Sequence, residues 1–300
     1  MKKCIIYVFS GTGNTHLIAE LYKKFLIEYE TTIYPIKMPS GKVTSDVPNP
    51  ADFDMVGIGH PVHGFNAPRI MWEFCKSLPA TQKPAFILTT SGEGLHFNDF
   101  ASQKVVRLMS KKGYDFVQQM RYVMPYNMIF RHSPEMVKSE YLYAEKLAEH
   151  SCKEIQAGTR TKIHRRNFFS AFAVIVRFLL WIYARVQSPF MRVNKKTCIA
   201  CQKCVRVCPY GNITYDSEKN RFKFGTNCLL CVACSFGCPT CSISIGLLNG
   251  WRVNGDYKIL EIAKDESIDF PYFTKENLHG LKRILYLGYY NRVRKLLGAE

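Results

Sequence analysis

Nine of the twelve cysteines in this 300-residue chain lie between Cys198 and Cys241. Eight of the nine form two runs with the same spacing, in which gaps of two, two and three residues lead to a Cys-Pro pair. The first run is Cys198, Cys201, Cys204 and Cys208, and the second is Cys228, Cys231, Cys234 and Cys238. Disulfide scaffolds belong to small exported domains, whereas this clustering indicates two metal centres with thiolate ligands.

The spacing favours iron–sulfur clusters over zinc. A cubane cluster needs four thiolates from different directions, so a tight loop can supply three of them and a distant cysteine the fourth. Structural zinc sites commonly include histidine, but both runs here consist of cysteine alone and repeat one spacing. Zinc is therefore the weaker alternative.

Residues 192–247 resemble the bacterial two-cluster ferredoxins, which are small α+β domains. In that family the fourth cysteine of each run ligates the other cluster. The resemblance implies one 4Fe-4S cluster on Cys198, Cys201, Cys204 and Cys238, and a second on Cys228, Cys231, Cys234 and Cys208. Cys241 departs from the minimal pattern. We expect inert, packed thiols at the positions outside the runs, which are Cys4, Cys75, Cys152 and Cys241.

The first 155 residues alternate apolar, β-branched runs with stretches of helical periodicity. The expected strands are 3–9, 31–36, 53–59, 84–90 and 116–123. The expected helices are 15–29, 68–77, 97–112 and 134–155. This alternation predicts an α/β fold with a doubly wound parallel sheet of five strands. Such a sheet binds ligands at the carboxyl ends of its strands.

A loop rich in glycine and hydroxyl side chains follows the first expected strand and opens the first expected helix. It reads Ser-Gly-Thr-Gly-Asn-Thr over residues 10–15. Glycines let backbone amides approach an anion, and a helix N-terminus adds partial positive charge. The loop lacks the Gly-Lys-Ser/Thr ending of nucleotide hydrolases and the GxGxxG spacing of dinucleotide folds. It therefore predicts a phosphate site formed by Ser10, Thr12, Gly13, Asn14 and Thr15.

Residues 1–155 resemble the flavodoxins, in which a loop of this type binds the phosphate of FMN. Two further loops match the flavodoxin loops that contact the flavin ring. The resemblance implies ring contacts for Pro61, Val62, His63, Gly64 and Phe65, and for Thr90, Ser91, Gly92 and Gly94. The second loop lacks the usual stacking tyrosine, and His96 and Phe97 are the nearest candidates. We expect His63, before His60, to stabilise negative charge on reduced flavin.

The connecting segment is both basic and apolar. Residues 153–206 hold 12 of the 41 Lys and Arg residues but only one of the 24 acids, in a chain of formal net charge +17. This concentration indicates an anionic partner: an acidic redox protein, or an anionic membrane that residues 165–196 would contact. Nucleic acid is not expected, because the segment lacks a reading motif.

Residues 165–187 within it predict an apolar helix whose basic edge is Arg166, Arg177 and Arg185. A membrane span is disfavoured, because the apolar stretch is short and Arg177 lies at its middle. Two interpretations are open: a helix buried between two domains, or a helix lying on an anionic membrane.

The whole chain resembles the fused flavodoxin and ferredoxin proteins of anaerobic bacteria, the "ferrodoxin" family. The implied organisation is an FMN-binding domain (1–155), a connector helix (156–191), a two-cluster 4Fe-4S domain (192–247) and a C-terminal helical cap (248–300) with a helix over 275–297. The opening residues lack the apolar core of a signal peptide. We therefore expect a cytoplasmic protein, with membrane association through the connector.

The resemblance implies an electron-transfer protein that passes electrons between FMN, the two clusters and external redox partners. The alternative is an FMN-dependent reductase of a small substrate, fed by the clusters. No arrangement of cysteine, serine or carboxylate residues identifies a nucleophile or a general acid. An electron carrier is therefore favoured over a catalytic oxidoreductase.

Overall fold

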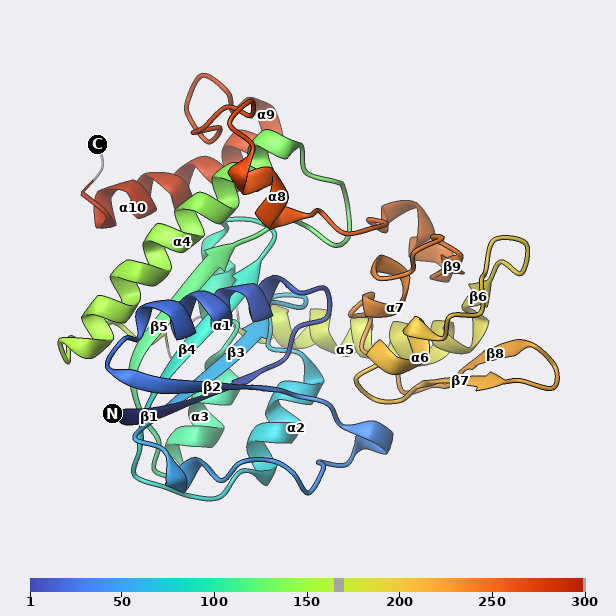
Figure 1. Ribbon diagram of the computed structural model, residues 1–300, viewed down its shortest axis with the longest axis horizontal. Coiled ribbons are helices and arrows are strands. Elements are labelled where there is room, and N and C mark those ends of the chain that lie inside the picture. Colours follow the sequence, from blue (N-terminus) through green and yellow to red (C-terminus); the bar gives the residue numbers. More distant parts are fainter. Residues whose placement is uncertain (165–169, 299–300) are drawn as a thin grey trace.

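The computed structural model of the chain describes residues 1–164 and 170–298. Its N-terminal half is built on a five-stranded parallel sheet in the order β2-β1-β3-β4-β5 (Figure 1). The strands are β1 (Lys2–Val8), β2 (Tyr29–Pro35), β3 (Met55–Pro61), β4 (Pro84–Ser91) and β5 (Asp115–Val123). This is the flavodoxin-like strand order, so the predicted doubly wound α/β fold is confirmed.

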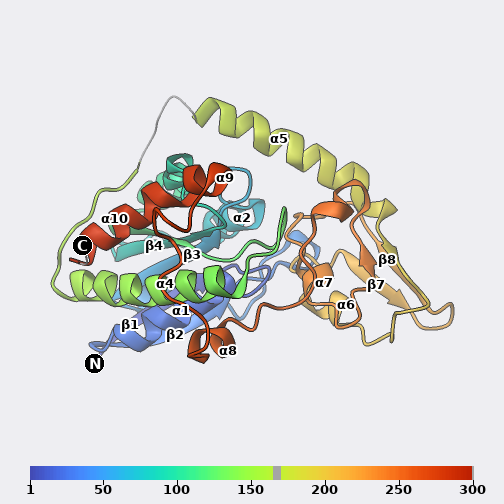
Figure 2. The ribbon, with the colours of Figure 1, turned by 90° about the horizontal axis from the view of Figure 1, so that it is seen from above.

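Helices cover both faces of this sheet (Figure 2). One face packs on α1 (Asn14–Phe25) and α4 (Pro134–Gln156), and the other packs on α2 (Arg69–Ser77) and α3 (Gln103–Ser110). The central strands β1, β3 and β4 are buried along most of their length. A parallel sheet covered on both faces requires such continuous apolar strands, which explains why the apolar runs alone locate them.

Gly57 on β3 leaves no room for a side chain. A Cβ atom there would lie 2.5 Å from Cζ of Phe86, whose ring stacks on Tyr22 at 5.1 Å. We expect Gly57→Ala to lower the free energy of unfolding by about 1–3 kcal/mol, the usual cost of overpacking a core. Urea unfolding followed by circular dichroism measures this, with Gly250→Ala as control because a Cβ there meets nothing within 4 Å. Equal changes in the two variants would contradict the prediction.

The second unit is small and has an internal repeat. Two short antiparallel pairs, β6 with β9 and β7 with β8, frame two short helices. The elements are α6 (Lys203–Val207), α7 (Ala233–Phe236), β6 (Arg192–Val193), β7 (Ile213–Asp216), β8 (Arg221–Phe224) and β9 (Ile243–Ser244). Each helix begins two residues after the second cysteine of a run, so the two runs have matching local structure. This is the predicted ferredoxin-like α+β unit.

The chain then returns to the first domain. A 3-10 turn (Gly246–Trp251) leads to α8 (Ile259–Lys264), α9 (Gly280–Lys282), a π-helical turn (Arg283–Leu287) and α10 (Gly288–Leu296). Phe273, Tyr286 and Tyr290 are fully buried in the same core as α4, and α10 lies beside α4 (Figure 2). The C-terminal segment therefore completes the flavodoxin-like domain, and residues 192–247 lie between two parts of it.

The expected helix over 275–297 is only partly correct. The helical run begins at Gly280 rather than at residue 275. Leu278, Tyr289 and Val293 are buried, but Leu281 and Ile284 are 67% and 72% exposed. The α-helical spacing fails here because Leu278 precedes the helix and a π-helical turn interrupts the helix between α9 and α10.

The connecting helix α5 (Ser170–Gln187) lies along the outside of the molecule and links its two units (Figure 2). Of the two interpretations, burial between domains is wrong. Ile175, Leu179 and Val186 are each more than half exposed, and only one side of the helix packs on the protein. The predicted start of this helix, with Arg166, lies outside the described residues. Among the described residues, no helix is long and apolar enough to cross a membrane.

Candidate functional site

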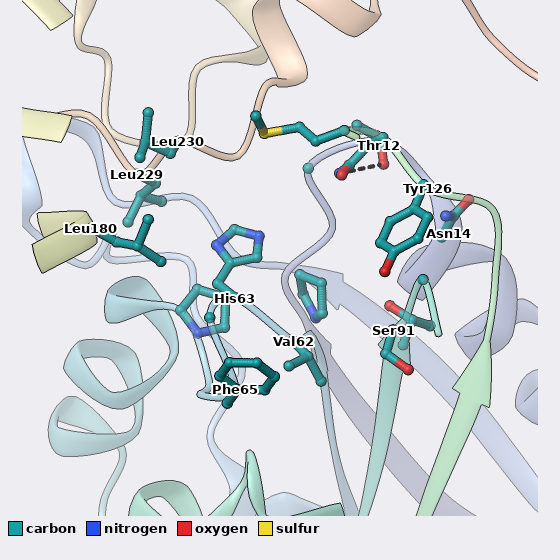
Figure 3. Close-up of a pocket in the computed structure, with 18 of the residues that line it drawn as sticks. Thr12, Asn14, Val62, His63, Phe65, Ser91, Tyr126, Leu180, Leu229 and Leu230 are labelled. Carbon is teal, nitrogen blue, oxygen red and sulfur yellow. Dashed lines mark hydrogen bonds between the residues drawn. The ribbon is translucent and has the colours of Figure 1, made fainter. Parts of the chain in front are cut away.

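A cavity of about 520 Å³ lies at the carboxyl ends of β1, β3 and β4. The three loops singled out in the sequence line it together (Figure 3). The lining includes Ser10, Thr12, Asn14, Thr15, Pro61, Val62, His63, Gly64, Phe65, Thr90, Ser91 and Gly92. Gly13 and Gly94 lie outside it. Gly13 faces a smaller cavity behind the first loop, and the amide of Gly94 donates to the carbonyl of Leu285 at 2.8 Å.

The first loop is fixed by one hydrogen bond within it and by bonds to β4 and to the loop after β5. The amide of Gly13, at a φ of 99°, donates to Oγ of Ser10 at 3.1 Å and turns the chain into α1. Oγ1 of Thr15 lies 2.7 Å from Oγ1 of Thr90, which ties the first loop to β4. Oγ1 of Thr12 accepts a bond from Asn127 at 3.3 Å. The N-terminus of α1 therefore meets the cavity, as an anion site requires.

The loop after β4 is held by Arg121 and by the C-terminal segment. Arg121 is 6% exposed, pairs with Asp99 at 2.7 Å, and donates to Oγ of Ser91 at 3.1 Å. The hydroxyl of Tyr286 donates to the carbonyl of Gly92 at 2.9 Å. A loop secured from two sides keeps its geometry before any ligand arrives.

The two histidines of the loop after β3 have different surroundings. His60 is fully buried, where its Nδ1 donates to the carbonyl of Pro61 and its Nε2 faces Oγ of Ser102, both at 3.0 Å. His63 lies on the cavity wall (Figure 3). Burial, with a smaller contribution from the neighbouring His60, lowers the pKa of His63 to about 4. His63 is therefore neutral at pH 7 in this cavity and acts as a hydrogen-bonding group rather than a cation.

His60 predicts a pH dependence of stability. Burial lowers the pKa of His60 from 6.5 to about 4, so the unfolded chain binds its proton first as the pH falls. The stability that His60 contributes is complete above pH 6.5 and is lost as the pH falls toward 4. Acidification from pH 7.5 to pH 5 should lower the free energy of unfolding of the unmodified chain. In His60→Gln this decrease should be smaller by about 2 kcal/mol. Urea unfolding at both pH values measures this.

The matched control is His16→Gln, which alters a histidine whose side chain is 45% exposed. That variant should keep the pH dependence of the unmodified chain. Identical pH dependence in all three proteins would rule out a buried neutral His60.

The loop after β5 supplies an aromatic residue that the sequence analysis missed. Tyr126 lines the cavity (Figure 3), and its hydroxyl donates to the carboxylate of Glu93. Its ring covers Gly92 so closely that a Cβ there would lie 2.1 Å from Cδ1 of Tyr126. The earlier candidates, His96 and Phe97, do not line the cavity. Tyr126 lies three residues beyond the end of β5, and β5 ends at the same edge of the sheet as the other loops of the cavity. This position was the sequence signal that could have identified Tyr126.

The opposite wall of the cavity comes from outside the flavodoxin-like domain. Leu180 of α5 and Leu229 and Leu230 of the second cysteine run face the loops of the sheet (Figure 3). The other contributions from α5 and the second cysteine run are Arg177, Trp181, Ala184 and Cys228, and the turn that follows the iron–sulfur domain adds Leu248 and Trp251. A Cβ at Gly64 would lie 2.5 Å from Cδ1 of Leu180, so α5 lies tightly against the loop after β3. The connector thus forms part of the site.

The eight run cysteines line two small cavities. One of about 40 Å³ is lined by Cys208, Cys228, Cys231 and Cys234, which we call the inner cysteine group. The other, of about 20 Å³, is lined by Cys198, Cys201, Cys204 and Cys238, which we call the outer cysteine group. Each group takes three cysteines from one run and the last from the other. In residues 1–164 and 170–298, no three His, Cys, Asp or Glu side chains are placed around a single metal ion.

The last cysteine of each run receives a backbone hydrogen bond. The amide of Asn212 donates to Sγ of Cys208 at 3.2 Å, and the amide of Ser242 donates to Sγ of Cys238 at 3.3 Å. Amide bonds to the sulfurs are one means by which a protein sets the potential of an iron–sulfur cluster. The two groups differ in exposure, because Cys231 is buried and Cys201 is exposed.

The inner group lies directly behind the large cavity. Cys228, Leu229 and Leu230 line both the large cavity and the inner cysteine cavity. A Cβ at Gly11 would lie 2.8 Å from the carbonyl oxygen of Cys231, so the first loop and the second cysteine run are in contact. The order through the molecule is therefore large cavity, inner group, outer group.

The iron–sulfur part of the chain is similar in sequence to known proteins. Residues 190–239 match the family described as "4Fe-4S dicluster domain". Archaeal-type glutamate synthases [NADPH] from Thermotoga maritima and Thermotoga sp. (strain RQ2) are 45% identical over 87 residues, which is 29% of this chain. This chain spans only 14% of the length of those relatives.

Flavodoxin-like structures align with the other part of the chain. A WrbA-like flavodoxin from Agrobacterium tumefaciens aligns at 14% identity over 53% of this chain and 100% of its own, with a TM-score of 0.37. A flavoprotein in complex with FMN from Lactobacillus acidophilus aligns at 15% identity over 40% of this chain and 93% of its own, with a TM-score of 0.33. The fold assignment follows from the strand order of the sheet. The chain therefore joins a flavodoxin-like domain to a small ferredoxin-like 4Fe-4S domain, which matches the dicluster family over residues 190–239.

Proposed function

We propose that this protein transfers electrons between FMN, bound in the large cavity, and two 4Fe-4S clusters held by the inner and outer cysteine groups. The observation that carries the proposal is that Cys228 lines both the large cavity and the inner cysteine cavity. When bound, the flavin accepts one or two electrons and each cluster accepts one. Joining the two parts in one chain replaces a bimolecular encounter with an internal step.

The residues around the large cavity fit FMN. Thr12, Asn14 and Thr15 at the start of α1 would hold the phosphate, because hydroxyl groups and a helix N-terminus favour an anion. Tyr126, Val62 and Leu230 would border the ring, because they give the cavity apolar walls. The volume of about 520 Å³ falls within the range of small-molecule sites.

The outer group is the expected point of exchange with an external redox protein. Cys201 is exposed, as are Lys203 and Arg206 on the same segment. An exposed cluster flanked by cations would attract an acidic partner and speed its association. This assigns the inner cluster to exchange with the flavin and the outer cluster to exchange with the partner.

The test is photoreduction of the flavin in anaerobically purified protein. We expect about eight irons and one FMN per chain, and bleaching of the cluster absorption after a light flash that reduces the flavin. Protein without flavin, or with reduced flavin and unchanged cluster absorption, would overturn the proposal.

A second candidate function is reduction of a small substrate at the flavin. It rests on Glu93, whose carboxylate lines the cavity and accepts bonds from Tyr126 and Asn98. When this carboxyl group is protonated, it can supply a proton to a reduced product. Glu93→Gln separates the two functions: it should leave flash-induced cluster bleaching intact and abolish turnover of a small acceptor if this second function operates.

A further inference from the structure

Helix α5 carries a continuous apolar stripe on its outer side. Ile175, Leu179, Ile182 and Val186 follow helical spacing and are 57%, 58%, 39% and 62% exposed. The opposite side packs on the protein, where Ala184 is 2% exposed and Leu180 contacts the loop after β3. A contiguous exposed patch of large apolar side chains on a folded protein marks an interaction surface.

Cations border this stripe, and acids are missing from the whole segment. No Asp or Glu occurs in residues 155–215. Arg185 is exposed on α5 itself. Beside the N-terminal half of the helix, Lys76 of α2 and Lys104 of α3 lie 5.3 and 3.1 Å from the centroid of the Trp72 ring. The stripe is therefore apolar along its axis and positive at its flanks.

We infer that α5 attaches the protein peripherally to an anionic lipid surface. The helix lies in the plane of the headgroups, with the stripe of Ile175, Leu179, Ile182 and Val186 at the acyl boundary. Arg185, Lys76 and Lys104 meet lipid phosphates. Interfacial helices bind by this combination of buried apolar area and attraction to anionic lipids.

A second copy of the chain is a less suitable occupant. Two copies meeting through α5 would bring two cationic surfaces together, and like charges across an interface oppose association. Negative lipid headgroups complement the same cations. Charge therefore separates the two occupants, although both would cover the stripe.

Attachment through α5 would hold the electron-transfer site beside the membrane. The inner side of α5 lines the large cavity through Arg177, Leu180 and Trp181. Redox partners that reside in or on the membrane would then be within reach. The lipid inference itself does not depend on the proposed function, because vesicle binding is measured without electron transfer.

The experiment is vesicle flotation of the full-length protein. We expect binding to vesicles that contain phosphatidylglycerol, little binding to phosphatidylcholine alone, and release at high salt. Leu179→Glu should weaken binding at least about ten-fold, because it places a charge at the acyl boundary. Removing two flanking charges, in Lys104→Gln with Arg185→Gln, should weaken binding about 30-fold.

The matched control is Ile27→Glu, which alters a residue that is 76% exposed in the turn between α1 and β2. It should bind vesicles like the unmodified protein. Three results would overturn the inference: no vesicle binding, equal binding to neutral and anionic vesicles, or equal loss in Ile27→Glu and Leu179→Glu. If the protein does not bind vesicles but forms a dimer that Leu179→Glu dissociates, the stripe is instead the contact surface for a second copy.

Discussion

Cys208→Ser should remove the inner cluster, although Cys208 belongs to the run that otherwise ligates the outer one. Cys208 lines the inner cavity with Cys228, Cys231 and Cys234. Serine is a poor ligand for iron, so the variant should retain about half of the iron of the unmodified protein. Because the inner group lies between the large cavity and the outer group, flash reduction of the flavin should no longer bleach the remaining cluster.

Two further variants make this result specific. Cys238→Ser should also retain about half of the iron, but it removes the outer cluster, so flash-induced bleaching persists. Cys241→Ser should retain all the iron, because Cys241 is exposed and lines neither cysteine cavity. Iron analysis with flash absorption on the three proteins checks all of this. Persistent bleaching in Cys208→Ser and its loss in Cys238→Ser would reverse the assigned order.

Thr12→Asp should weaken FMN binding at least about 100-fold, because a carboxylate beside a phosphate dianion costs several kcal/mol. Thr12 lines the cavity in the first loop, where its Oγ1 accepts the bond from Asn127. Thr12→Asn has nearly the same shape as Thr12→Asp and no charge, so its affinity should stay within a few-fold of the unmodified protein. Calorimetric titration of flavin-free protein with FMN gives both affinities.

Riboflavin provides the second arm of this experiment, because it has the ring and lacks the phosphate. Thr12→Asp and the unmodified protein should bind riboflavin equally well. Equal weakening of FMN and riboflavin would place the phosphate elsewhere in the cavity and contradict the role of the first loop.

The strands and the cysteine runs were predictable because each depends on residues that are close together in the sequence. Each strand of a sheet covered on both faces must be apolar along its length, so β1, β3 and β4 appear as continuous runs. The cysteine spacing is likewise local, because three cysteines of each group come from one short loop. Both features depend on neighbours in sequence, which periodicity and spacing record.

The cavity wall formed by α5 and the second cysteine run depends on packing between distant parts of the chain. No local sequence pattern predicts it. Leu180 and Leu230 read as ordinary apolar residues, and they meet at the cavity only because the iron–sulfur domain lies against the carboxyl edge of the sheet. Tyr126 follows the fifth strand, which carries none of the expected phosphate or ring motifs. The environment of α5 also depends on packing, because one apolar helix sequence suits either burial or a lipid surface.

The C-terminal return has a dynamic consequence. After the iron–sulfur domain, the amide of Val253 donates to the carbonyl of Asn127 at 3.2 Å, and the hydroxyl of Tyr257 donates to the carbonyl of Tyr126 at 2.7 Å. The domain is thus anchored through α5 at one end and through this strap at the other. A domain held at two points does not rotate about a single hinge, as a mobile electron-carrying domain does. Electrons would therefore pass here over a fixed distance, and the rate would not depend on solvent viscosity.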